Sequence, residues 1–377
     1  MEFDWSAEQR QFFAGAEAFA RSRLPTAVPS AAEFREAFRS LGDFGALGLC
    51  IDEPLGGMGF DSLTAAATLE ALGRGCPDLG LLFSAAAHLF ACAVPIAAHG
   101  HPDMISQVVP RLCSGEWVGA NAITEAEAGS DVGALATRAI REGDEYRLTG
   151  VKSYVTNGPL ADLFLVYATL DPSHGYLGVT GFVVERDRPG LTIGERFSTM
   201  GLDSSPIGSI YLDECRVPLD HRLGDEGSGA KIFAESMHFE RTCLLAAWVG
   251  AMDRGLAQVI EHARERKQFR RPIGKFQALA HRIVDMKLRL ESARLLLYRA
   301  CWARDRGEQA TLEVALAKLA ISEAAVQNAL DAIQVFGGAG YMREMGVERG
   351  LRDAIPTTIF SGSSEIQRDL IAKGLGL

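Results

Sequence analysis

One stretch near the C-terminal end combines residue types that let a bulky ligand come close to the backbone. Thr357–Arg368, TTIFSGSSEIQR, holds a Ser-Gly-Ser-Ser turn, then an acid and the start of an apolar-periodic tail. Small residues of this kind suit the mouth of a binding site. The position expected to react, Ser361, is a hydroxyl, which needs an activating base that the neighbouring sequence does not offer. The chemistry must therefore come from another part of the chain.

A carboxylate on an apolar helical face is one source of a base. In MHFERTCLL, Glu240 lies on the same predicted helical stripe as Phe233, Met237, Leu244 and Trp248. Burial among apolar side chains should raise the pKa of this carboxyl toward neutrality, which suits a general base. The competing interpretation is a structural carboxylate that pairs with a buried arginine.

Two stretches in the middle of the chain could contact a flat polar ring. In Ile123–Asp131, ITEAEAGSD, Thr124, Ser130 and free backbone N–H groups near Gly129 could bind a ring edge or a phosphate. In KSYVTNG, Tyr154 and Thr156 fall on one face of a predicted strand, so that an aromatic ring could stack while a hydroxyl bonds the ring edge. A polar loop and a surface strand are the simpler alternatives.

Two further stretches could bind a diphosphate. Arg264–Gln277, RERKQFRRPIGKFQ, places five basic residues within eight positions at a helix end. One arginine side chain can donate two parallel hydrogen bonds to two oxygens of a phosphate. Gln334–Tyr341, QVFGGAGY, has paired glycines just after a helix, which could admit a pyrophosphate or simply end the helix. Because QVFGGAGY is not GxGxxG after a strand, it does not indicate a Rossmann loop.

The surrounding sequence predicts three domains in the order α, β, α. Helical periodicity, with Ser6 as the first N-cap, predicts an all-α domain over residues 1–118. Short alternating runs between turn signals predict a β-barrel or sandwich over 119–226. An unbroken apolar-periodic run of about 40 residues from Gly227, two more long helices and a shorter one predict a four-helix bundle over 227–377. The fold class is therefore α+β and multi-domain.

Composition limits the classes of function. The chain has 377 residues, 47% hydrophobic and 23% charged, with a formal charge of -10, which argues against a nucleic-acid partner. The seven cysteines are scattered, which predicts reduced thiols in the cytoplasm and no metal site. No targeting segment is recognised, and no apolar run is judged to approach a membrane span, so no membrane partner is expected.

In order and spacing, these stretches resemble the acyl-CoA dehydrogenase family over essentially the whole chain. ITEAEAGSDVGAL resembles that family's first signature, and QFRRPIGKFQ and IQVFGGAGYMRE resemble its dinucleotide-binding stretches. ERGLRDAIPTTIFSGSSEIQRDLIA resembles its C-terminal signature. Four motifs in the right order, in an α–β–α chain of the right length, leave little room for a chance match.

The resemblance implies FAD held non-covalently between the β domain and the C-terminal bundle. Ile123, Thr124 and Ser130 are implied along one side of the flavin ring, and Tyr154 and Thr156 along the other. Many members have Trp where this chain has Tyr154, and either side chain can stack on a ring.

The same resemblance implies that a second subunit completes the cofactor site. The residues implied at the diphosphate and adenosine of a neighbouring subunit's FAD are Arg266, Gln268, Phe269, Gln334, Gly337 and Gly338. Ser363 and Glu365 are implied to close over the cofactor, and the chain is expected to form a homodimer or homotetramer. Arg270 departs from the family's usual Gln-Phe-Gly, which leaves the shape of that turn open.

The family reaction is the α,β-dehydrogenation of an acyl thioester, in which a carboxylate removes the α-proton and hydride leaves Cβ for flavin N5. In much of the family the carboxylate occupies the position of Ser361. A minority, including isovaleryl-CoA-type enzymes, take it from the long helix just before an arginine, and this matches Glu240 followed by Arg241. We therefore predict Glu240 as the catalytic base.

Substrate contacts are predicted at Ser130, Arg241 and Ser361. Arg241 would contact the pantetheine arm or orient loops, and Ser361 would leave room in the pocket. The rival bases are Glu365, four positions after Ser361, and then Glu125 and Glu127.

The predicted activity is oxidation of an acyl-CoA or acyl-carrier-protein thioester, with an acceptor such as an electron-transfer flavoprotein. A flavin-dependent oxidase or N-hydroxylase of the same fold is the alternative, and a non-catalytic relative ranks below both. Acyl chain length, and the choice between CoA and a carrier protein, stay open at this level.

Overall fold

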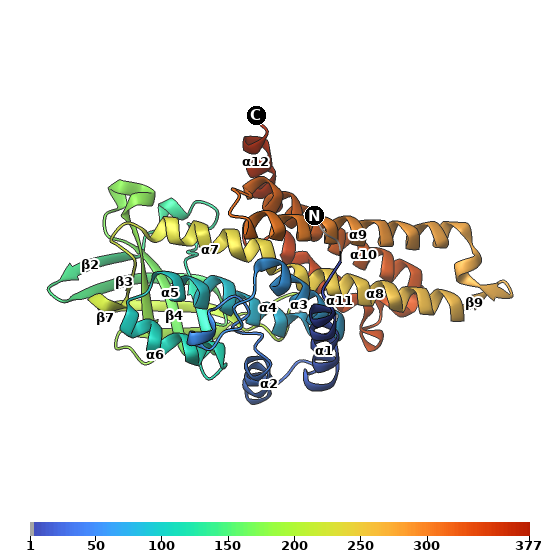
Figure 1. Cartoon of the computed structure of the whole chain (residues 1–377), viewed down its shortest axis with the longest axis horizontal. Helices are drawn as coiled ribbons and strands as arrows, with labels where there is room; N and C mark the ends of the chain where they lie inside the picture. The colour runs from blue at the N-terminus through green and yellow to red at the C-terminus, as the bar shows by residue number, and fades with distance from the viewer. Residues whose placement is uncertain (1–3) are drawn as a thin grey trace.

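The computed structural model describes residues 4–377, in which helices are followed by a sheet and then by helices again (Figure 1). The N-terminal helices are α1 (Ala7–Arg23), α2 (Ala31–Asp43), α3 (Ser62–Gly75), α4 (Leu79–His88), α5 (Val94–His99) and α6 (Pro102–Cys113). Ser6 begins α1 as predicted: its side chain accepts from Gln9 N, and the Gln9 side chain accepts from Ser6 N. The predicted α–β–α order is confirmed.

One N-terminal segment corrects an expectation about membranes. Leu79–His99, which comprises α4, a π-helical turn at Leu89–Ala93 and α5, is long and apolar enough to cross a bilayer by length and composition. Because 78% of that window is buried inside the chain, it is a core helix here. The judgement that no apolar run approaches a membrane span is therefore wrong for this segment, and also for Gly229–Glu265, which passes the same test with 61% of its window buried.

The middle domain is a single curved mixed sheet of eight strands, at the left of Figure 1. The strands are β1 (Gly119–Ala122), β2 (Arg138–Glu142), β3 (Glu145–Thr156), β4 (Leu163–Thr169), β5 (Val179–Glu185), β6 (Leu191–Arg196), β7 (Ile207–Pro218) and β8 (Arg222–Leu223). Their order is β6-β7-β3-β2-β4-β5-β8, with β1 parallel to β4. One face encloses its own apolar core, which includes Tyr146, Phe164 and Phe182. The other face packs on the helices through Leu163, Leu165 and Tyr167.

The C-terminal part is a helical bundle, most of which lies at the right of Figure 1. Its helices are α7 (Gly229–Cys243), α8 (Ala246–Glu265), α9 (Gln277–Asp305), α10 (Thr311–Phe336), α11 (Val347–Ala354) and α12 (Ser364–Gly374), and strands β9 (Lys267–Gln268) and β10 (Arg271–Pro272) form a hairpin between α8 and α9. The long run predicted from Gly227 is helical over Gly229–Glu265, with a tightened turn at Leu244–Leu245, where Trp248 N donates to Leu245 O at 3.0 Å, between α7 and α8. No proline marks this break in the sequence.

Helices α3 and α8 cross with their backbones in contact. A Cβ atom on Gly250 would lie 1.9 Å from Glu70 O, and one on Gly73 would lie 2.1 Å from Ala247 O. Both positions therefore require glycine, and the crossing fixes α8 against the N-terminal domain.

A buried ionic network lies beside this crossing. Arg294 of α9 donates from Nε to Glu70 Oε1 at 2.8 Å and from Nη2 to Asp253 Oδ2 at 3.0 Å. Tyr298 OH donates to the other Glu70 oxygen at 2.7 Å. Because Glu70 is buried, the network ties α3, α8 and α9 together through one carboxylate.

Replacing Arg294 with Ala should lower the free energy of unfolding by about 3 kcal/mol, because it leaves Glu70 buried with too few cationic partners. The matched control is Arg299→Ala on the same helix, whose pair with Glu313 is exposed and should contribute less than about 1 kcal/mol. Urea unfolding measures both. Equal losses for the two variants would contradict the interpretation.

Candidate functional site

Glu240 lies in the last turn of α7, the first helix of the C-terminal bundle. Its side chain is 6% exposed, as the apolar stripe predicted. Burial raises the pKa of the Glu240 carboxyl to about 7, against the opposing effects of a Ser361 hydrogen bond and of the Arg241 and Lys318 charges. A carboxylate with this pKa is divided between its two protonation states near neutral pH.

Ser361 contacts Glu240 directly, with its hydroxyl donating to Glu240 Oε1. The loop that carries it, residues 357–363, is held at three backbone carbonyls. Lys318 Nζ and Ser322 Oγ donate to Thr357 O at 2.8 and 2.9 Å. Arg241 Nε donates to Ser361 O at 2.5 Å, and the Gln367 amide to Gly362 O at 3.0 Å. The 357–363 loop is therefore fixed against α7, α10 and α12.

Arg241 of α7 packs against the 357–363 loop. Burial lowers the pKa of its guanidinium while Glu240 opposes that shift, and its partner is the Ser361 carbonyl. Of the two predicted roles for Arg241, orienting a loop is the one that this contact matches.

Lys318 was missed at the sequence level. It is fully buried on α10, and burial lowers the pKa of its ammonium group to about 8, with Arg241 acting in the same direction. A lysine inside the apolar run ALAKLAISEAA is the signal that could have found it. Its charge helps to keep Glu240 ionised.

Aromatic rings fill the space next to Ser361. Phe360 stacks on Phe83 with centroids 4.7 Å apart, and Trp248 lies 5.7 Å from Phe360. Trp248 is fully buried and donates from Nε1 to Asp353 O at 3.0 Å. These three rings make a rigid wall beside the loop.

The rival carboxylates have other roles. Glu125 accepts from Lys152 Nζ at 2.7 Å and from Ala136 N and Thr137 N. Burial raises the pKa of Glu125, but Lys152 and the N–H donors outweigh this and lower it overall, so Glu125 is a poor base at neutral pH. Glu365 is exposed on α12, and its own backbone N–H and then Ser363 lower its pKa as well. Glu127 is exposed too.

The residues predicted along a flavin ring lie at one place in the β domain. Thr124 O accepts from Ser153 N at 2.9 Å, and buried Lys152 donates to Ile123 O at 3.1 Å, so the loop before β2 is pinned to β3. Ile123 is buried, Thr124 half-buried, and Ser130 exposed farther along the loop.

Tyr154 projects from a β-bulge in β3, where the pairing with β7 shifts between Lys152 and Val155. Its φ is +56° and its side chain is 67% exposed, with its ring 5.7 Å from that of Phe197. Val155 is buried between the exposed Tyr154 and the half-buried Thr156. An exposed aromatic ring on a strained, conformationally fixed backbone fits a stacking platform for a flat ring.

The two stretches predicted at a diphosphate meet at the far end of the bundle. The ring of His262 on α8 stacks on Phe336 of α10, with centroids 4.1 Å apart, so the ends of these helices adjoin. Arg266, Gln268 and Phe269 lie on or beside the β9–β10 hairpin, and Gln334, Gly337 and Gly338 at the end of α10. All six are exposed, and a Cβ added to either glycine would meet no atom within 4 Å.

The hairpin turn is made by Phe269 and Arg270, with φ of +50° and +65°. Positive φ at both central residues is the geometry of a type I′ turn. This is the shape of the turn at Arg270 that the sequence left open. Phe269 is 87% exposed at the tip.

In one chain, the two groups of predicted cofactor residues lie at opposite ends of the molecule. Figure 1 shows the β sheet at the left and the β9 hairpin at the far right. Ser363 is the N-cap of α12, where its hydroxyl accepts from Ile366 N at 3.5 Å, and the exposed Glu365 follows it. The two groups are therefore well separated within one chain.

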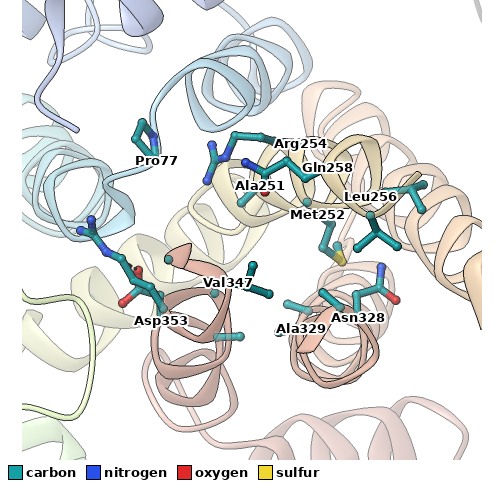
Figure 2. A pocket seen from close by; sticks show the side chains of 18 of the residues that line it. Pro77, Ala251, Met252, Arg254, Leu256, Gln258, Asn328, Ala329, Val347 and Asp353 are labelled. Carbon is teal, nitrogen blue, oxygen red and sulfur yellow. Dashed lines mark ion pairs between the residues drawn. The ribbon is translucent and has the colours of Figure 1, made fainter. Parts of the chain in front are cut away.

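A cavity of about 270 Å³ lies between α8, α10 and α11 (Figure 2). Trp248 forms part of its wall, and none of the predicted site residues lines it. Two of its polar groups have partners: Asn328 Nδ2 donates to Met286 O, and Asp353 accepts from Leu202 N. Burial raises the pKa of Asp353 to about 6.

Three family descriptions match the chain along nearly all its length. Acyl-CoA dehydrogenase, N-terminal domain, matches residues 6–116; the middle domain matches 120–215; and the C-terminal domain matches 227–376. The chain is 51% identical over 337 residues to an L-prolyl-[peptidyl-carrier protein] dehydrogenase of Pseudomonas fluorescens, which covers 89% of each chain. A Serratia protein of the same name is 40% identical and spans 100% of this chain and 99% of its own.

Solved structures agree closely with the fold. The prolyl acyl carrier protein oxidase AnaB has a TM-score of 0.96 at 44% identity, covering 99% of this chain and 100% of its own. PigA with FAD and proline has 0.96 at 40%, and butyryl-CoA dehydrogenase of Megasphaera elsdenii has 0.95 at 32%, each covering all of both chains.

Proposed function

The chain belongs to the acyl-CoA dehydrogenase family, and we propose that it oxidises a prolyl thioester on a peptidyl-carrier protein, with Glu240 as the base. It is an FAD-dependent oxidoreductase of thioester substrates, acting on CH–CH donors. The observation that carries the choice of base is the burial of Glu240 beside Ser361, with a pKa near neutrality.

The base has to remove a proton from the carbon next to the thioester carbonyl. Glu240 Oε1 accepts the Ser361 hydroxyl, so the other oxygen can take the proton. Lys318 and Arg241 stabilise the ionised carboxylate, while burial keeps it basic enough to react. FAD, when bound, supplies the acceptor for the hydride that leaves the β-carbon.

We propose that FAD lies between two copies of the chain. Thr124, Tyr154 and Thr156 would hold its ring, and the hairpin and the end of α10 of a second copy would reach its diphosphate. The separation of these groups within one chain supports a homodimer or a larger homo-oligomer (Figure 1). The basic residues around the hairpin suit two phosphate charges.

A carrier-bound prolyl group is favoured over a long acyl chain by one observation. The relatives named for prolyl carrier protein substrates reach 40–51% identity with this chain, whereas the butyryl-CoA enzyme reaches 32%. We place the reaction in the cytoplasm, with an electron-transfer flavoprotein as acceptor. Oxygen is the second candidate, because a relative is named an oxidase.

Replacing Glu240 with Gln should slow anaerobic flavin reduction about 100-fold or more, because the base is lost. In the wild-type protein the rate should rise with pH to a plateau, with a midpoint near 7, since the ionised carboxylate is the active form. The control is Glu235→Gln, an exposed position on the same helix. A Glu240→Gln variant that reduces FAD at the wild-type rate would disprove the assignment.

Replacing Phe269 with Ala should weaken FAD binding and dissociate the oligomer, because the exposed ring at the hairpin tip would lose its contact with a second copy. Flavin absorbance after gel filtration measures both effects. The control Arg270→Gly keeps the ring and removes a side chain from a left-handed position, so the oligomer should persist. It serves as a control for the oligomer alone, because Arg270 is one of the basic residues proposed at the diphosphate. An oligomer that keeps its FAD without Phe269 would contradict the proposed contact.

A substrate panel tests the carrier. Prolyl-carrier protein should bleach the flavin faster than prolyl-CoA, and both faster than butyryl-CoA or free proline. Stopped-flow absorbance under argon gives the rates, and admitting oxygen or electron-transfer flavoprotein afterwards identifies the acceptor. Fastest bleaching by butyryl-CoA would instead assign a short-chain acyl-CoA substrate.

A further inference from the structure

Ser361 occupies the position where the resemblance implies a catalytic acid in much of the family, and its contacts suggest a different role for the serine. Resting on the proposed function of Glu240, we propose that Ser361 is a positioning residue whose hydroxyl holds Glu240 Oε1, and that Arg241 holds the serine backbone in the conformation this contact needs. The expected substrate contact of Ser361 would be secondary to this role.

The backbone of Ser361 is specialised. Its φ is +53°, and that of the next residue, Gly362, is +89°. A non-glycine residue in this region is unfavourable by about 1 kcal/mol or more and persists only where its surroundings enforce it. The enforcing group is Arg241, whose Nε lies 2.5 Å from Ser361 O. A Cβ on Gly362 would lie 3.0 Å from Arg241 Nη2 and 2.9 Å from the Gln367 amide, so glycine allows the guanidinium to lie flat on the loop.

The chemistry of position 361 follows from its partner. A carboxylate there would repel Glu240, and an apolar side chain would leave Oε1 without this donor. A hydroxyl donates to the ionised form and adds no charge. The charged groups that act on Glu240 are Arg241 of α7 and Lys318 of α10, and Glu365 of α12 acts on Lys318. Ser361 is therefore the neutral donor in a site where both charged partners are cations.

Removing the hydroxyl should raise the pKa of Glu240, because a hydrogen bond to the charged form is lost. The test variant is Ser361→Gly, since glycine adopts the left-handed conformation without strain. The midpoint of the pH profile for flavin reduction should move up by about one unit, with an about tenfold loss of rate at pH 6 and little loss at pH 9. In a purely structural role, the loss would be the same at every pH.

A second readout does not depend on turnover. The infrared band of the protonated Glu240 carboxyl, identified by its absence in Glu240→Gln, should titrate with the same upward shift in Ser361→Gly. This band reports the carboxyl alone and separates it from Lys318, whose own pKa lies at about 8. Ser361→Ala should show the same shift, which excludes added loop flexibility as the cause.

Ser361→Thr separates the hydroxyl from stability. It keeps the donor but places a β-branched side chain at φ +53°, so the melting temperature should fall while the infrared midpoint stays near the wild-type value. An unchanged midpoint in both Ser361→Gly and Ser361→Ala would overturn the inference. If Glu240→Gln retained flavin reduction, the proposed base would fail, while an infrared shift would still establish the contact between Ser361 and Glu240.

Discussion

The site depends on one buried carboxylate that has to stay ionisable. Burial of Glu240 favours its neutral form. Three groups favour the ionised form instead: the Ser361 hydroxyl, Arg241 and Lys318. The balance leaves the pKa of Glu240 near 7, between that of an ordinary carboxyl and that of a fully desolvated one. Helix α7, helix α10 and the 357–363 loop all meet at this point.

The same balance fits a serine at position 361, where the resemblance implies an acid in much of the family. With the carboxylate on α7, a second acid on the loop would repel it. The loop instead contributes a neutral donor and three carbonyl oxygens, and the cations that approach the loop are satisfied by those oxygens. The exchange of an acid for a serine thus fits the whole cluster, including Gly362, whose missing side chain makes room for Arg241.

Much of this could be read from the sequence. The apolar stripe around Glu240 predicted its burial, and capping signals and hydrophobic periodicity predicted the α–β–α order, because both depend on local spacing. The turn that separates α7 from α8 could not be predicted, since neither a proline nor a glycine marks it in the sequence. The bulge at Tyr154 depends on register with β7, and Lys318 matters only through its neighbours in space. These features belong to tertiary contacts, which periodicity does not record.

The contact of α3 with α8 has a mechanical consequence. At Gly73 and Gly250 the two backbones touch with no side chain between them, so the crossing has little freedom to adjust. From Gly250 to the hairpin at Arg266, α8 extends about 24 Å as a stiff rod. A tilt of about 5° at the crossing would displace the hairpin tip by about 2 Å, which is enough to break a hydrogen bond. The close packing at Gly73 and Gly250 thus fixes the direction of α8, and with it the position of Phe269 at the hairpin tip.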